Sequence, residues 1–196
     1  MKILLSPTFL DSFTFFRSTN GATDKKRQEI IDYLNGIKTP DTEAQAFGKQ
    51  FEADVCDCID GKAASVVGSP YWEAAAEFGE MIDNVPRQVH VHFYLTKKII
   101  FHGYIDFLGL NVVDDVKTTK TYTNNAKLDL GKYYSKFQHR VYLAALNQQT
   151  PGRYKRFRYL IYDRTAEATF IEEYRWQDAF VSELADIWRE LSGYLK

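Results

Sequence analysis

The chain has 196 residues, of which 45% are hydrophobic and 15% aromatic, and its formal net charge is -1 at pH 7. This composition excludes a disordered chain and a protein that attracts nucleic acid through its overall charge, and the length suits a single domain over residues 1–196. The apolar residues 3–5 are too few for a signal peptide and no stretch is long enough to span a membrane, so a cytoplasmic protein is expected.

The first half of the chain has the spacing of apolar residues that is typical of helices. Ser6 and Pro7 are suited to the N-cap and the first position of a helix. Further helices are predicted over residues 24–35, 42–59 and 71–81. A helical N-terminal segment over residues 1–45 is therefore expected to precede a core over residues 46–196.

The second half begins with a pattern that is typical of strands. Strands are predicted over residues 88–95, 99–108, 112–118, 157–162 and 168–174. Helices are predicted over residues 132–147 and 177–194, and the polar residues 119–129, which precede the first of these helices, have the composition of a loop. Helices that cover a mixed sheet imply an α/β fold.

Two adjacent predicted strands carry the polar residues Asp106 on the first strand and Asp115 and Lys117 on the second. If the turn between the strands has an even number of residues, Asp106 lies opposite Asp115, and Lys117 shares the face of Asp115. Two facing carboxylates repel each other, and Mg²⁺ would relieve that repulsion. A lysine beside the ion can orient a water or help to deprotonate it, so the pattern indicates metal-assisted phosphodiester hydrolysis. Asp114, on the other face, is expected to tolerate replacement far better.

These three residues also suit a solvated strand face or a surface ion pair, because Asp-x-Lys alone is a common sequence. The strands around them contain apolar residues such as Ile105, Phe107 and Val116. Such strands are too apolar for an exposed ribbon, which favours a pocket within a buried sheet.

Further candidates lie on predicted helices. Glu52 follows Gly48 by four residues and could be a third carboxylate that faces the sheet, or a residue at the boundary of the core. Gln138 and Tyr142 lie one helical turn apart. They could contact a phosphate and stack on a base, or they could be a pair at the edge of the core.

Histidines and cysteines offer weaker candidates for a metal site. His90 and His92 share a strand face, but no third ligand is evident, and a polar strand face is the favoured interpretation. Cys56 and Cys58 point in different directions on a predicted helix, which favours neither a disulfide nor a metal clip. Two cysteines also cannot supply the four thiolates of an iron–sulfur cluster.

Positive charge is concentrated in one part of the chain. Between Val116 and Arg164 there are eleven Lys or Arg residues and two acidic residues. This segment could form a cationic surface next to the candidate site, or it could be a solvated surface of mixed charge.

Four motifs in order resemble those of the PD-(D/E)XK nucleases, in the RecB-like branch that includes phage exonucleases and CRISPR-adaptation nucleases. The motifs are Gly48-x-x-x-Glu52, Gly103-x-x-Asp106, Asp115-x-Lys117 and Gln138-x-x-x-Tyr142. The resemblance spans about residues 6–175 and implies a restriction-endonuclease-like mixed β-sheet core flanked by helices.

The resemblance also implies roles for individual residues. Asp106 and Asp115 would bind the metal, and Lys117 would position or activate the water. Glu52 would be the acidic residue of the first core helix and a further metal ligand, at a position where many relatives have histidine. The signature residues that would contact DNA are Gln138 and Tyr142, and Lys120 and Arg140 of the basic segment would bind the substrate with them.

A divalent-metal-dependent DNA nuclease is therefore expected, most simply an exonuclease of phage or prokaryotic DNA recombination or processing. The resemblance implies Mg²⁺, with Mn²⁺ able to substitute, no iron–sulfur cluster, and DNA as the partner in a prokaryotic cell or a phage-infected host. It leaves room for a recombination or loading partner protein. The alternative is a catalytically inactive DNA-binding or regulatory protein that retains the fold. A sequence-specific endonuclease is disfavoured because no separate recognition domain is evident.

Overall fold

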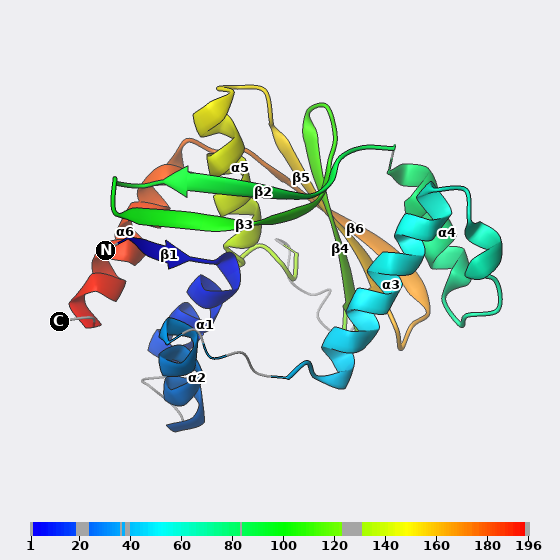
Figure 1. Cartoon of the computed structure of the whole chain (residues 1–196), viewed down its shortest axis with the longest axis horizontal. Helices are drawn as coiled ribbons and strands as arrows, with labels where there is room; N and C mark the ends of the chain where they lie inside the picture. The colour runs from blue at the N-terminus through cyan, green and yellow to red at the C-terminus, as the bar shows by residue number, and fades with distance from the viewer. Residues whose placement is uncertain are drawn as a thin grey trace.

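The computed structural model describes residues 2–18, 24–35, 37, 40–82, 84–122 and 131–194. Within these residues, helices flank a six-stranded mixed sheet (Figure 1). The strands are β1 (Ile3–Leu5), β2 (Arg87–Tyr94), β3 (Ile99–Leu108), β4 (Val112–Thr119), β5 (Arg156–Asp163) and β6 (Ala168–Arg175). The helices are α1 (Pro7–Ser18), α2 (Asp24–Leu34), α3 (Glu43–Ile59), α4 (Trp72–Met81), α5 (Gln138–Gln149) and α6 (Ala179–Tyr194), with a 3-10 turn at Ala63–Ser65. The predicted α/β class is confirmed.

The sheet has the strand order β1-β3-β4-β5-β6, and β2 pairs with β3. β1 runs parallel to the beginning of β3, whereas β4 pairs with the end of β3 in antiparallel orientation. β4 and β5 are parallel, which requires the crossover that contains α5. The long strand β3 therefore joins the two halves of the sheet.

Two of the predicted helices, α1 and α3, begin at residues whose side chains cap them. The Ser6 hydroxyl oxygen accepts a hydrogen bond from the backbone amide of Phe9 at 3.2 Å, at the start of α1. Thr42 and Gln45 form a capping box at the start of α3. A box of this kind satisfies two backbone donors that have no partner within the helix.

Two elements differ from the prediction. The sequence did not predict β1, because three apolar residues are too few to show a period. α5 was expected to begin at residue 132 but begins at Gln138. The backbone amides of Lys132 and Tyr133 instead donate to the carboxylate of Glu172, at 2.6 and 2.9 Å, which holds this segment in turns ahead of the helix.

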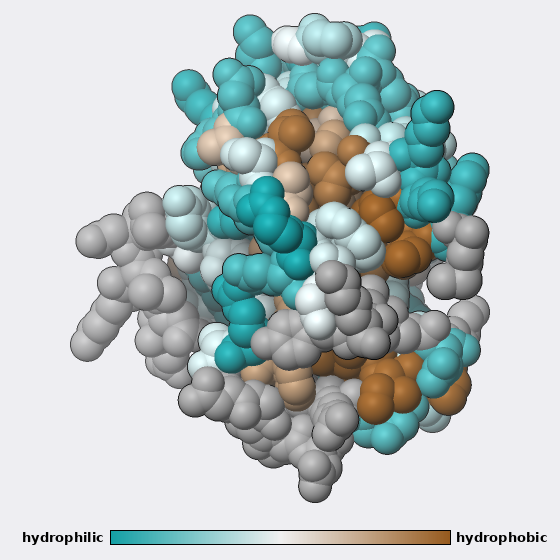
Figure 2. Space-filling view, turned by 90° about the vertical axis from the view of Figure 1, so that its left-hand side faces the viewer, coloured by the Kyte–Doolittle hydropathy of each residue, from teal (hydrophilic) through white to brown (hydrophobic). Residues whose placement is uncertain are grey.

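Hydrophobic side chains pack on both faces of the sheet. One cluster joins α1, α5 and α6 to the sheet, and the other joins α3 and α4 to it. In Figure 1, α5 lies behind β2 and β3, while α3 and α4 lie at the opposite end of the molecule from α6. Seen from the left of that view, hydrophobic residues reach the surface between hydrophilic ones (Figure 2).

Two further observations concern membrane-spanning helices and the cysteines. No helix among the described residues is both long and apolar enough to cross a membrane. Cys56 and Cys58 are free thiols on α3.

Candidate active site

The turn between β3 and β4 brings the two predicted aspartates together. Leu108 pairs with Val113, and the backbone amide of Gly109 donates to the backbone oxygen of Val112 at 2.9 Å, so Gly109 and Val112 form the last pair. The loop between them has two residues, 110–111, which is the even number that the predicted register requires. The paired residues end at Phe107 and Asp114, and the next residues in this register are Asp106 and Asp115. The Asp106 side chain lies close enough to Asp115 to raise its pKa, and Asp106 Oδ2 accepts a hydrogen bond from the backbone amide of Val116 at 3.4 Å. Directly opposed residues share one face of a sheet, so both carboxylates point to the same side.

Asp115 is only 1% exposed, and besides Asp106 its carboxylate contacts Gln138 and Lys117. Its Oδ1 accepts a hydrogen bond from the side-chain amide of Gln138 on α5. The ammonium of Lys117 forms an ion pair with Oδ2, which accepts no hydrogen bond of regular geometry. The Lys117 side chain keeps 29% of its surface exposed, so it connects the buried carboxylate to solvent.

Glu52 and Gln88 complete this cluster from α3 and β2. The Gln88 side-chain amide donates to Glu52 Oε1 at 2.7 Å and, more weakly, to Asp106 Oδ1 at 3.5 Å. Gln88 has a φ of 50°, in the left-handed region, which side chains other than glycine rarely adopt. Spacing alone gave no signal for Gln88, because its role depends on this backbone conformation and on a contact with α3.

The crowding of carboxylates changes their acidity. Burial raises the pKa of Asp115 to about 8, although Lys117 opposes the shift. Burial also raises the pKa of Asp106, and burial together with the negative charge of Asp115 raises that of Glu52. Burial alone would lower the pKa of Lys117, but the two aspartates outweigh it and the pKa is raised. The cluster thus favours a cation next to its carboxylates.

The donor set fits a hard divalent cation. Among the described residues no three His, Cys, Asp or Glu side chains converge as metal ligands. Two opposed aspartates, one with a buried oxygen that lacks a regular hydrogen bond, match the way Mg²⁺ is held by one or two carboxylates and several waters. Glu52 is close enough to raise the negative charge of the site, and its direct ligation stays a prediction.

Tyr142 packs against the backbone of β3 beside this cluster. It is buried, and burial followed by the charges of Asp115 and Asp106 raises its pKa. A side chain at Gly103 would place its Cβ 2.6 Å from the Tyr142 hydroxyl and ring. Gly103 is therefore required for the close approach of α5 to β3, whereas a Cβ at Gly48 would meet Thr118 at an ordinary 3.4 Å.

The remaining predicted substrate-binding residues lie in different surroundings. Lys120 is exposed directly after β4, three residues beyond Lys117. Arg140 forms an ion pair with Glu183 on α6 at 3.0 Å and donates to the backbone oxygen of Tyr134. Lys120 is therefore open to solvent, whereas Arg140 is engaged between α5 and α6, and contact of Arg140 with a substrate would require it to leave this ion pair.

Acidic residues from elsewhere in the chain offset part of the basic segment. Arg156 pairs with Glu173, and Lys136 pairs with Asp11, both at 3.5 Å. The count of charges between Val116 and Arg164 therefore overstates the positive charge that this segment presents to solvent.

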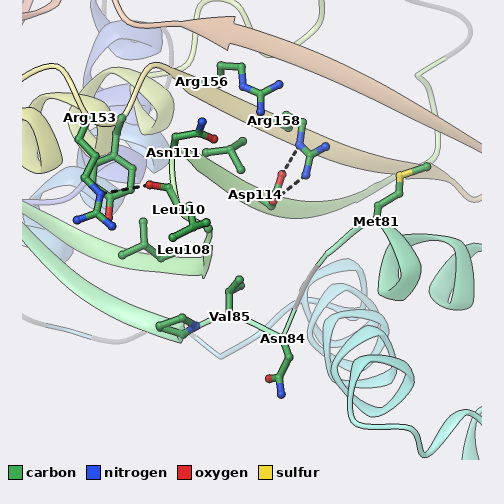
Figure 3. A pocket seen from close by; sticks show the side chains of 14 residues that line it. Met81, Asn84, Val85, Leu108, Leu110, Asn111, Asp114, Arg153, Arg156 and Arg158 are labelled. Atoms are coloured by element: carbon green, nitrogen blue, oxygen red, sulfur yellow. Dashed lines mark hydrogen bonds and ion pairs between the residues drawn. The ribbon is translucent and has the colours of Figure 1, made fainter.

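Asp114 lies on the opposite face of β4 and has a structural partner that the spacing did not reveal. Its carboxylate accepts two hydrogen bonds from the Arg158 guanidinium, at 2.6 and 2.9 Å (Figure 3). The pair lines a cleft of about 760 Å³ next to the β3–β4 turn, together with Arg153 and Arg156. Asp114 was expected to tolerate replacement, but its hydrogen bonds to Arg158 mean that replacing it should lower the stability of the fold.

The six-stranded sheet with its flanking helices matches the fold of two solved structures, which confirms the predicted fold class. A predicted exonuclease from Eubacterium rectale aligns over 98% of this chain and 80% of its own, with 14% identity and a TM-score of 0.57. LHK-Exo, solved in complex with dAMP, aligns over 98% of this chain and 91% of its own, with 15% identity and a TM-score of 0.51. At these identities the likeness shows the fold alone. No protein-family model and no curated protein matches the sequence.

Proposed function

We propose that the protein is a divalent-metal-dependent DNA nuclease of the PD-(D/E)XK superfamily, an exonuclease that acts in phage or prokaryotic DNA recombination or processing. The observation that carries this proposal is the pair of opposed aspartates on β3 and β4, with Lys117 ion-paired to Asp115 and partly open to solvent. The exonuclease fold and the four ordered motifs support it.

The proposed chemistry divides between the acidic residues and the lysine. Asp106 and Asp115 would hold Mg²⁺ or Mn²⁺, and the bound ion would stabilise negative charge on the phosphate and supply an acidic water. Because neighbouring carboxylates raise the pKa of Lys117, its side chain carries a positive charge. Lys117 therefore suits hydrogen-bond donation to a water or to a phosphate oxygen better than proton abstraction.

Residues of α5 and α3 would fix the geometry of the reacting groups. Gln138 orients the Asp115 carboxylate through its hydrogen bond, and Tyr142 supports the same region from the side of β3. Gln88 ties Glu52 to Asp106, so that β2, β3 and α3 hold the acidic cluster in one arrangement. Lys120 lies outside this cluster, where it could meet a phosphate of the strand.

Cleavage of end-labelled linear DNA and of closed circular DNA tests the proposal. We expect wild-type protein with Mg²⁺ to degrade linear DNA and to leave the circle intact. Asp115→Asn and Lys117→Met should each lower the rate by about 10²–10⁴-fold. The matched controls Asp186→Asn and Lys62→Met change exposed residues and should cleave like the wild type.

Two results would contradict the proposed hydrolysis. Equal cleavage by wild type and both active-site variants would trace the activity to another protein in the preparation. DNA binding without cleavage in either Mg²⁺ or Mn²⁺ would favour the catalytically inactive DNA-binding protein.

A further inference from the structure

A strip of aromatic rings lies on one face of the β2–β3 ribbon, and its members are Tyr94, His92, His90, His102 and Tyr104. β2 and β3 pair in a register that puts His90 opposite Tyr104 and His92 opposite His102. Alternation along each strand sends these side chains to the same side. We call this set the histidine–tyrosine strip.

The rings of the strip contact one another as a continuous surface. His90 stacks on Tyr104, with centroids 4.5 Å apart and an angle of 14° between the planes. The His90 ring also lies 4.2 Å from that of His92, which in turn stacks with Tyr94 at 6.0 Å. His102 joins the set at 5.8 Å from His90.

The strip is open to solvent although its residues are aromatic. Tyr104 is 53% exposed and Tyr94 is 49% exposed. The alternate residues of the same strands, such as Val91 and Ile105, point to the other face and pack into the core with α5, which lies behind β2 and β3 in Figure 1. The fold thus needs only one face of this ribbon for its core.

The strip begins at the proposed catalytic cluster. Asp106 follows Tyr104 by two residues on β3, so the two side chains share a face about 7 Å apart along the strand. On the neighbouring strand, Gln88 precedes His90 by two residues and contacts Asp106. A DNA strand with one phosphate at Asp106 and Asp115 would pass over these rings if the DNA ran along the β2–β3 ribbon.

The charge of the ribbon suits a polyanion. No Asp or Glu occurs from Arg87 to Ile105, a stretch that includes three histidines. The exposed residues Lys97 and Lys98 lie in the turn at the far end of the ribbon. Burial and the neighbouring histidines lower the pKa of His102, and burial and His92 lower that of His90, so both rings are mainly uncharged at neutral pH and suited to stacking.

A zinc site is the other chemistry that three histidines could offer. No group of three or more potential ligands within the described part of the chain has the geometry to hold a metal. The rings instead stack on one another, and stacking of a base on such a surface needs no sequence-specific contact.

We propose that the histidine–tyrosine strip binds the unpaired nucleotides of a single DNA strand by base stacking and guides that strand to Asp106 and Asp115. An unpaired strand fits because its bases can leave one another and stack on the rings, whereas the bases of a duplex already stack within the helix. The part of this inference that rests on the proposed nuclease function is the direction in which the DNA strand is guided, toward Asp106 and Asp115.

Fluorescence anisotropy in EDTA separates binding from cleavage. The probes are an oligothymidylate of about 15 nucleotides, an abasic strand of equal length and charge, and a blunt duplex. Wild-type protein should bind the oligothymidylate more tightly than either of the other probes. Tyr104→Ile and His90→Val keep strand-forming side chains but remove a ring, and each should weaken oligothymidylate binding about 5- to 100-fold.

The controls distinguish stacking from charge and from misfolding. Both variants should bind the abasic strand like the wild type, which also shows that they are folded. Tyr104→Phe should retain oligothymidylate binding, and Trp72→Ala, at an exposed aromatic residue of α4, should not change it. Oligothymidylate binding by Tyr104→Ile and His90→Val that equals wild type, or an equal loss for both single strands, would overturn the proposal.

Failure of the strip and failure of the proposed nuclease function give different results. Base-dependent binding without cleavage in Mg²⁺ or Mn²⁺ would reject the hydrolysis and support the strip. Cleavage that depends on Asp115, together with unchanged strand binding by the strip variants, would support the hydrolysis and reject the strip.

Discussion

Asp114 and Arg158 form a two-point ion pair between β4 and β5, and Asp114 is only 3% exposed. The adjacent residue Asp115 points to the other face of β4, where it faces Asp106 and Lys117. Two consecutive aspartates thus have separate tasks. Asp114 pairs with the partly exposed guanidinium of Arg158, and Asp115 belongs to the acidic cluster.

Replacing Asp114 should destabilise the fold more than replacing Asp115. Asp114→Ala removes a buried carboxylate that accepts two hydrogen bonds from Arg158, which should lower the free energy of unfolding by about 1–3 kcal/mol. Asp115→Asn removes a charge that its surroundings disfavour, so its free energy of unfolding should equal or exceed that of the wild type. Urea denaturation in EDTA measures both values, and a greater loss for Asp115→Asn would contradict the assignment.

The raised pKa of Asp115 predicts a pH dependence of stability for the metal-free protein. The folded state holds this proton up to about pH 8, whereas an exposed aspartate in the unfolded chain loses it near pH 4. The stabilisation from this group is therefore complete below about pH 4 and is lost as the pH rises to about 8. Asp106 and Glu52 shift in the same direction.

Urea denaturation at several pH values between 5 and 8, in EDTA, tests this dependence. The free energy of unfolding of Asp115→Asn should fall less over this interval than that of the wild type. The control Asp186→Asn, at an exposed position of α6, should retain the wild-type slope. Parallel slopes for wild type and Asp115→Asn would show that Asp115 is ionised throughout.

Mg²⁺ should stabilise the folded protein even without DNA. A ligand that binds only the folded state at 100 times its Kd adds about 2.7 kcal/mol to the free energy of unfolding. We expect thermal melting of the wild type to shift upward with Mg²⁺ or Mn²⁺, and Asp106→Asn and Asp115→Asn to lose most of this shift. Sodium chloride of equal ionic strength is the control, because an equal shift with sodium would indicate screening rather than a site.

The periodic features of the sequence predicted much of this site. Features that depend on contacts between residues far apart in the sequence could not be predicted from it. The alternation of strand residues predicted that Asp106 and Asp115 would face each other, because a two-residue turn fixes the register. The start of α5 could not be predicted, since Glu172 binds the preceding backbone amides from 40 and 39 residues away. Gln88 was also missed, because its left-handed φ breaks the strand pattern that the sequence displays.

Gln88 permits a direct test of backbone strain at the site. Glycine normally destabilises a strand relative to alanine, but at a φ of 50° it relieves the strain that alanine retains. Since both substitutions remove the side-chain amide, the comparison isolates the backbone. Gln88→Gly should therefore be more stable than Gln88→Ala by about 0.5–1 kcal/mol.

An ordinary strand position provides the control for this comparison. Ile171 is exposed on β6, and there the glycine variant should be less stable than the alanine variant. The same order of stability at both positions would contradict strain at Gln88.

The contact between Gly103 and Tyr142 predicts that a single methyl group disturbs the site. A Cβ at Gly103 would lie 2.6 Å from the Tyr142 ring and hydroxyl, so Gly103→Ala must displace this buried ring or the elements that hold it and should cost about 1–3 kcal/mol of stability. Gly193→Ala is the matched control, because a Cβ there meets nothing within 4 Å and alanine favours the helix. In a double-mutant cycle by urea denaturation, Tyr142→Leu should reduce the cost of Gly103→Ala, since it removes the colliding ring. Strictly additive free energies would instead place the strain of Gly103→Ala elsewhere in β3.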